Sequence, residues 1–88
     1  MGFDERKPIF DVFGIVTGTA VSSLFPSVPC SLANLKARSN NIGSFFIGGI
    51  FELDAGQETG WFDISNLNLL THTNASGTSD KLAYWIKR

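Results

Sequence analysis

Apolar and polar residues alternate along several short stretches of this chain, and such alternation is typical of β-strands with one buried face. The clearest case is the segment KLAYWIKR near the C-terminus. Leu82, Tyr84 and Ile86 would point to one side of a sheet, while Ala83 and Trp85 would point to the other. We therefore expect this segment to be the closing strand of a layered β-fold.

The N-terminal part of the chain carries similar signals. From residue 9 onward the sequence is rich in Val, Ile, Phe and Thr, and two glycines interrupt it, so we expect one or two strands over Phe10–Thr17 and Thr19–Leu24. Pro26 and Pro29 follow, and proline lacks the N–H that a central strand donates, so this stretch predicts a loop or an irregular edge. The charged residues 1–8 predict an N-terminal arm outside a domain of residues 9–88.

The segment LANLKARSNNIGSFFIGG predicts a β-hairpin. Leu35–Arg38 alternates apolar and charged side chains, as in a strand with one solvent-exposed face. Asn40, Asn41 and Gly43 follow, and these residue types adopt positive φ at low cost in tight turns. Ser44–Gly48 would return as the second strand, so we expect a meander in which consecutive strands pair.

The segment FELDAGQETGWFDISNLNLL adds a turn and two more strands. Asp54 and Gly56 suit a turn, a short strand with Trp61 in the core is expected after it, and a further strand is expected over Leu69–Thr73. No stretch shows a convincing helical pattern. These signals together predict an all-β fold, a single small antiparallel β-sandwich or barrel of about six to seven short strands.

Composition narrows the function classes. A domain of 88 residues has a thin core and usually gains support from disulfides, metals or partners. One cysteine and one histidine can form neither a disulfide within the chain nor a structural zinc site, so we expect no metal and no cofactor. Association into a homo-oligomer or a symmetric array is then the natural inference.

Charge and hydropathy exclude two further kinds of partner. Seven basic and eight acidic residues form no basic patch, so we expect no binding to nucleic acid. No apolar run approaches the length that spans a bilayer, and the first residues lack the apolar segment of a signal peptide. We therefore expect a protein made in the cytoplasm and not held in a membrane.

Catalysis is not expected. No nucleophile or orienting carboxylate can be assigned beside His72, which we interpret as an ordinary surface histidine. Cys30 has no basic neighbour before Lys36, and we expect a small buried side chain there. Four carboxylates lack the dense Asp/Asn alternation of a calcium loop, and solvated turn residues are a better interpretation than a glycosidase pair. These carboxylates are Glu52, Asp54, Glu58 and Asp63.

The aromatic residues leave one binding function open. Trp61, Tyr84 and Trp85 would serve as a stacking platform in a small carbohydrate-binding module. At alternate strand positions beside Leu and Ile, however, such residues are more typical of a core or an interface. Sugar binding therefore stands as an alternative of a different class.

A series of short motifs runs from about Leu24 to Ile86: a Pro-Cys entry, a strand ending in a charged residue, an Asn-x-Gly turn, an aromatic-Ile-Gly strand, an L-x-x-G-Q turn, an N-L-x-x-L segment and a closing aromatic strand. They are Pro29-Cys30, Leu35–Arg38, Asn41–Gly43, Phe46–Gly48, Leu53–Gln57, Asn66–Leu70 and Leu82–Trp85. In this order the motifs resemble a group of small structural proteins of tailed bacteriophages. The chain departs from that group in a shortened spacer at Ile50–Glu52 and in its N-terminal segment MGFDERKPIFDVFG.

The resemblance implies a non-enzymatic virion protein, a compact β-sandwich that decorates or cements the capsid shell. Its partners would be the major capsid protein or other virion proteins, and a ring at the neck or tail or a fibre is the alternative location. Contacts are expected in the arm, the exposed turn and the edge strands. The candidate contact residues are Phe3, Ile9, Phe10, Phe13, Asn40 and Asn41. The alternative for Ile9, Phe10 and Phe13 is that they simply begin the first strand.

Overall fold

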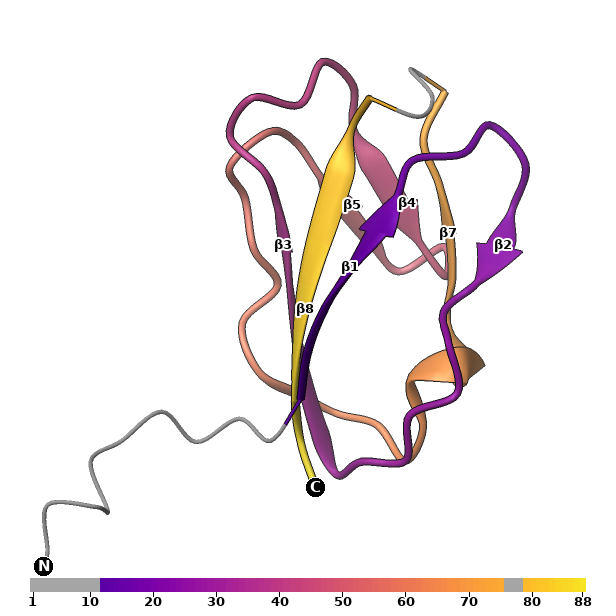
Figure 1. The fold of residues 1–88 in the computed structure, drawn as a ribbon, viewed down its shortest axis with the longest axis vertical. Helices are drawn as coiled ribbons and strands as arrows, with labels where there is room; N and C mark the ends of the chain where they lie inside the picture. The colour runs from indigo at the N-terminus through magenta and orange to yellow at the C-terminus, as the bar shows by residue number, and fades with distance from the viewer. Residues whose placement is uncertain (1–11, 76–78) are drawn as a thin grey trace, which may run out of the picture.

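Two antiparallel sheets pack face to face in the computed structural model, which describes residues 12–75 and 79–88 (Figure 1). The first sheet has the order β1-β8-β3-β6, and the second has the order β2-β7-β4-β5. The strands of the first sheet are β1 (Val12–Thr17), β8 (Lys81–Lys87), β3 (Leu32–Ala37) and β6 (Phe62–Asp63). Those of the second are β2 (Ser23–Leu24), β7 (Thr71–Thr73), β4 (Phe45–Ile47) and β5 (Phe51–Leu53). A 3-10 turn, η2 (Leu67–Leu69), leads into β7. The predicted small antiparallel β-sandwich is confirmed.

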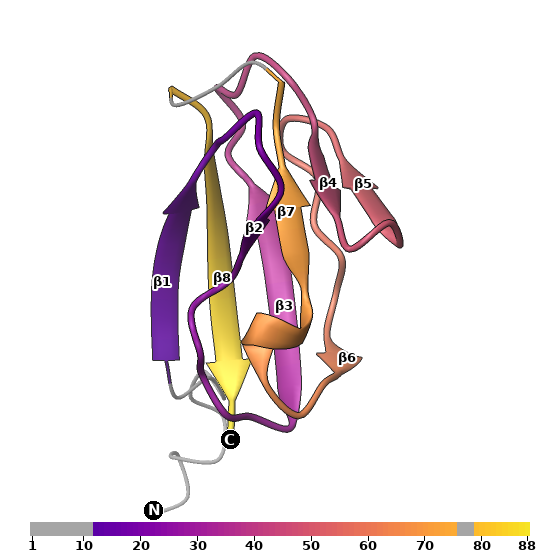
Figure 2. The same ribbon diagram turned by 90° about the vertical axis from the view of Figure 1, so that its right-hand side faces the viewer.

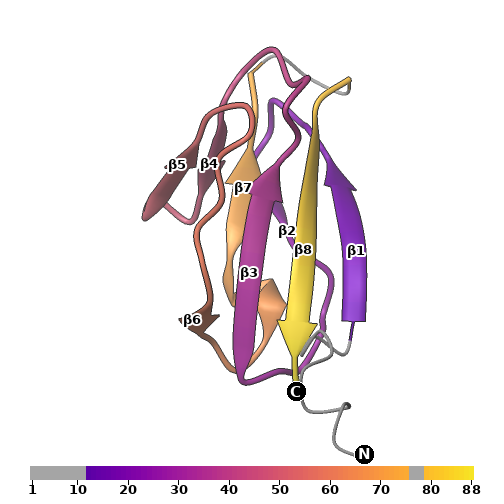
Figure 3. The same ribbon diagram turned by 90° about the vertical axis from the view of Figure 1, so that its left-hand side faces the viewer.

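The core lies between the two layers, which Figure 2 and Figure 3 show from opposite sides. In β8, Leu82, Tyr84 and Ile86 are buried against it, while Trp85 is half-buried on the opposite face, as the alternation predicts. Transfer of each large apolar side chain from water to this core contributes about 1.5–3 kcal/mol to the free energy of unfolding. The largest side chains with 2% exposure or less are Phe25, Phe45, Leu35, Ile47, Leu67, Leu82 and Ile86.

The predicted hairpin and meander are wrong. β3 pairs with β8 and β6 in the first sheet, whereas β4 pairs with β5 and β7 in the second, so the segment between them crosses from one sheet to the other. The physical reason is that Leu35 and Ala37 on β3, and Phe45 on β4, are all buried in the shared core. Two strands that each bury an apolar face against the other pack as layers and do not pair edge to edge.

The tight hairpin lies one strand later, between β4 and β5. Gly48 and Gly49 both have positive φ, at 56° and 71°, and the N–H of Ile50 donates to the carbonyl oxygen of Ile47 at 2.8 Å. Positive φ at both central residues matches the right-handed twist of the flanking strands. Asn40, Asn41 and Gly43 do not adopt the positive φ expected of them, because their segment spans the two layers.

Gly14 allows a close approach inside the first sheet. It faces inward on β1, directly opposite Tyr84 in the register with β8. A Cβ atom at position 14 would lie 2.2 Å from both Cζ and Oη of Tyr84, so the tyrosine ring lies over the glycine backbone. Glycine in a strand interior often marks such an approach.

Candidate interaction surface on the first sheet

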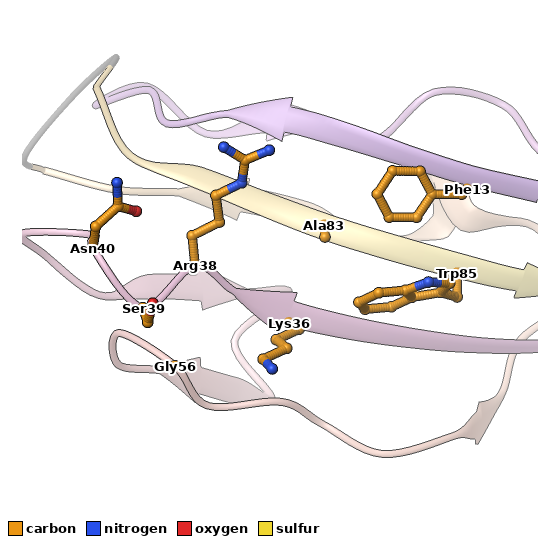
Figure 4. Close-up of a pocket in the computed structure, with 8 residues that line it drawn as sticks. All are labelled: Phe13, Lys36, Arg38, Ser39, Asn40, Gly56, Ala83 and Trp85. Atoms are coloured by element: carbon orange, nitrogen blue, oxygen red, sulfur yellow. The ribbon is translucent and has the colours of Figure 1, made fainter.

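An aromatic pair lies on the outward side of the first sheet (Figure 4). Phe13 on β1 and Trp85 on β8 are direct cross-strand partners, and their ring centroids are 5.4 Å apart with the planes tilted by 54°. Opposite residues of an antiparallel pair point to the same face, so the register itself brings the two rings together. Half of the Phe13 side chain remains exposed to solvent.

Two basic side chains line a pocket together with this aromatic pair. Lys36 on β3 and Arg38 just after it are both exposed, and Figure 4 shows Arg38 reaching across β8 toward β1. The small side chain of Ala83 lies between the aromatic and basic groups and leaves a shallow pocket there, which Ser39, Asn40 and Gly56 also line. We call the set Phe13, Lys36, Arg38, Ala83 and Trp85 the aromatic–basic face. Aromatic side chains and arginine are the residue types enriched in protein-binding surfaces, and this face has Phe13, Trp85 and Arg38.

The loop beside this face is held by a buried carboxylate. Asp80 is 1% exposed, and its two oxygens accept hydrogen bonds of 2.8 Å from the N–H groups of Ile42 and Gly43. The Nδ2 of Asn74 donates to the same carboxylate at 3.0 Å. The hydrogen bond from the Ile42 N–H is the main cause that lowers the pKa of Asp80. The carboxylate therefore fixes the crossover loop in its charged form.

Asn41 belongs to the same anchor. Its Nδ2 donates to the carbonyl oxygen of Lys81 at 2.8 Å, and its Oδ1 accepts from the N–H of Lys81 at 2.9 Å. The amide thus makes the same two hydrogen bonds to Lys81 as the backbone of a neighbouring strand residue would, at the N-terminal end of β8. Asn40, by contrast, is exposed beside the aromatic–basic face.

The predicted contact residues therefore separate into three groups. Phe13 and Asn40 line the pocket of the aromatic–basic face. Asn41 uses its amide within the chain. Phe3, Ile9 and Phe10 lie outside the described residues.

Sequence reasoning missed Lys36, Arg38 and Ala83 of the aromatic–basic face. It also missed the Asp80 carboxylate that holds the crossover loop. Lys36 and Arg38 could have been found, because alternation places both on the outward side of β3 along with the outward residues of β8. Asp80 could not, since in sequence it is one more polar residue of a loop.

The interpretation of His72 as a surface residue is wrong. Its side chain is 5% exposed on β7, and its ring lies edge-on to Phe25 with centroids 4.8 Å apart. Nδ1 is buried and has no hydrogen-bond partner among the described residues. Burial lowers the pKa of His72 because an apolar surrounding disfavours the charged imidazolium.

We expect the stability of the domain to fall as the pH drops below about 6.5, the pKa of an unfolded histidine. Between the unfolded pKa and the lowered folded pKa, the unfolded chain binds a proton at His72 and the folded protein does not. Stability therefore decreases with falling pH throughout this interval, and the decrease ends at the folded pKa. Urea unfolding at pH 7.5 and pH 5.5 measures the effect. A His72→Leu variant, which cannot titrate there, should lose clearly less stability over this interval, and equal losses in both proteins would contradict the assignment.

Trp61 is also not the core residue that the sequence suggested. Its side chain is 39% exposed, just before β6.

Cys30 is half-buried, and its thiol Sγ donates a hydrogen bond to the carbonyl oxygen of Ile64 at 3.2 Å. Burial raises the pKa of the Cys30 thiol, which keeps it protonated and weakly nucleophilic at neutral pH.

The four carboxylates considered in the sequence analysis are exposed, as expected: Glu52, Asp54, Glu58 and Asp63. Asp54 accepts a hydrogen bond from the hydroxyl of Ser44, and Glu58 accepts one from Nδ2 of Asn34 at 3.2 Å. In residues 12–75 and 79–88, no group of three or more His, Cys, Asp or Glu side chains could hold a metal ion. No helix in those ranges is long and apolar enough to cross a membrane.

Comparison with known proteins returned no relative. No protein-family model matches the chain, and neither a curated protein nor a solved structure matches it.

Proposed function

We propose that this protein is a non-enzymatic structural component of a tailed-phage virion, a decoration or cement protein that binds the assembled capsid shell. The observation that carries the proposal is the aromatic–basic face, in which the exposed Phe13 and the basic Lys36 and Arg38 surround a shallow hollow. An exposed aromatic residue beside a hollow gains free energy when a partner buries it. The order of motifs along the chain, which resembles small phage structural proteins, gives the partner class.

The protein would stabilise the shell because its binding is coupled to assembly of the capsid lattice. A protein that binds only the assembled lattice stabilises that lattice by the free energy of the added contacts. Symmetry repeats a modest contact at many equivalent sites, so a small domain with a small face can have a large total effect. The partner would be the major capsid protein or another virion protein.

Matched phenylalanines test the role of the face. Phe13 is 50% exposed on the first sheet, and Phe46 is 47% exposed on the outward side of the second. We expect Phe13→Ala to weaken binding to particles lacking the protein by about tenfold or more, as for an interface anchor, and Phe46→Ala to change it little. An equal loss of affinity in both variants, or no loss in Phe13→Ala, would show that the aromatic–basic face does not contact the particle. Quantitative co-sedimentation of each purified variant with the particles gives the affinities.

Copy number places the protein within the particle. Quantitative mass spectrometry of virions that carry its gene should give hundreds of copies for a shell decoration. A single ring's worth would move it to the neck, the tail or a fibre. Absence from purified virions would overturn the virion proposal.

A carbohydrate-binding module is the second candidate, and the exposure of Trp61 favours it. An indole that is 39% exposed beside a short strand can stack on a sugar ring. Titration with oligosaccharides while following tryptophan fluorescence separates the candidates, because a stacked sugar shifts indole emission. A shift that disappears in Trp61→Ala would support this second function.

A further inference from the structure

Within residues 12–75 and 79–88, β1 is an edge strand of the first sheet, with β8 as its one neighbour. β1 has six residues, whereas the other edge strands, β2, β5 and β6, have two or three. Its sequence, VFGIVT, contains no charged residue and no proline, which are the usual means by which a sheet edge avoids further pairing. In Figure 2 and Figure 3, β1 is the outermost strand on its side of the part of the chain that the structure describes.

The hydrogen-bond pattern shows which backbone groups face that edge. The N–H of Gly18 donates to the carbonyl oxygen of Asp80 at 2.8 Å, and these two residues continue the register of β1 with β8. In an antiparallel ladder, residues that bond to the neighbouring strand alternate with residues that do not. The even-numbered residues of β1 therefore bond to β8. Phe13, Ile15 and Thr17 direct their N–H and C=O groups to the free edge.

We propose that this edge binds β1 of a second copy of the chain, antiparallel, with Ile15 facing Ile15 across a two-fold axis. In this register Phe13 of each copy lies opposite Thr17 of the other, so all three open residues of both strands are paired. A shift by one residue would turn every side chain to the wrong face. A shift by two would leave one of the three without a partner in the other β1. The edge is therefore self-complementary about Ile15.

The side chains on the outward face agree with this pairing. Ile15 lies beside Ala83, which lies beside Lys36, so the central row of the joined sheets would place two Ile15 and two Ala83 side chains together. The contact covers Ile15, which is 41% exposed in the single copy. The two Lys36 residues would stand five strand spacings apart, about 24 Å, well beyond the distance at which salt screens their repulsion.

Lys81 would stabilise the pairing of the two β1 strands directly. The Nζ of Lys81 donates to Oγ1 of Thr17 at 3.2 Å, at the free edge. Because Thr17 lies opposite Phe13 of the second copy, the ammonium group would lie near that aromatic ring, where its charge is favourable. The inference depends on β1 and its neighbours alone, and it holds or fails separately from the proposed virion role.

Sedimentation equilibrium of the full chain tests the pairing through position 15. We expect the wild-type protein to reach twice the monomer mass as its concentration rises. Ile15→Lys should remain monomeric at concentrations where the wild type is dimeric, because it brings two ammonium groups together at the axis. Ile15→Thr keeps β-branching without charge and is the matched control, which should still dimerise. Thermal unfolding of each variant confirms that it folds.

Amide hydrogen exchange followed by NMR identifies the groups involved. In the dimer the N–H groups of Phe13, Ile15 and Thr17 should exchange slowly and lose this protection on dilution, while Gly14 and Val16 stay protected at every concentration. A monomer with fast exchange at the three odd positions would overturn the proposal. A monomer with slow exchange there would overturn it too, and would show that another segment of the same chain covers the edge.

Discussion

Replacing Gly14 with alanine is expected to lower the free energy of unfolding by about 1–3 kcal/mol, which is the usual cost of overpacking a close contact. The new Cβ would lie 2.2 Å from the ring carbon Cζ of Tyr84 and from its hydroxyl oxygen. The ring cannot move freely, because it is 8% exposed and lies edge-on to Phe25 at a centroid distance of 6.4 Å. Urea denaturation at neutral pH measures the change.

The same substitution in a Tyr84→Leu background separates this clash from a general effect of alanine in β1. Without the aromatic ring, alanine should be neutral or should stabilise the strand by about 0.5–1 kcal/mol, because glycine loses more backbone entropy on folding. The destabilisation by alanine should therefore disappear or reverse in the Tyr84→Leu background. A cost of similar size in both would show that the Tyr84 ring does not require glycine at position 14.

Replacing Asp80 with alanine is expected to loosen the crossover between the sheets and to lower the melting temperature by at least about 5 °C at pH 7. The N–H groups of Ile42 and Gly43 would lose their acceptors, and so would Nδ2 of Asn74, a residue with no exposed surface. Hydrogen bonds to a charged acceptor contribute more to stability than bonds between neutral groups, so losing several of them at once is costly. Serine at position 79, which is exposed, offers a control through Ser79→Ala, which should leave the melting temperature nearly unchanged.

The pH dependence of the wild type tests the charged form of Asp80. Because its folded pKa is lowered, its contribution is complete above the unfolded carboxyl pKa of about 3.9 and is lost as the pH falls through the folded pKa. Asp80→Asn keeps the shape and cannot ionise. Its melting temperature should be lower than that of the wild type at pH 7, and the difference should narrow toward pH 2. If the difference in melting temperature stayed constant from pH 7 to pH 2, protonation of Asp80 would not be the cause of the acid destabilisation.

The sequence predicted the strands better than their neighbours in space. Alternation in β8 identified the inward face of Leu82, Tyr84 and Ile86, because burial on one side imposes a period of two on the residues themselves. The choice of pairing partner for β3 left no such mark. Asn40 and Asn41 suit a tight turn as well as a crossover, and contacts far away in sequence, at Asp80 and Lys81, decide between the two.

The candidate surface was predictable in part for a related reason. Phe13 was expected as a contact because it is an apolar anchor of the N-terminal segment MGFDERKPIFDVFG. Its partner Trp85 lies 72 positions away and meets it only through the register of β1 with β8. His72 and Trp61 were misplaced because neither a short strand nor a polar context determines which side of a thin sheet faces the core. Burial of this kind depends on tertiary packing.

The place of β8 between β1 and β3 has a consequence for biosynthesis. Neither β1 nor β3 has the other as a neighbour, so the first sheet cannot join its N-terminal strand to the rest until residues 81–87 have left the ribosome. Folding must wait for nearly all of these 88 residues, and contacts of such long sequence separation form slowly. Until then, the uncharged strand VFGIVT stays unpaired in the nascent chain. Chaperone access during translation would therefore matter more for this domain than its small size suggests.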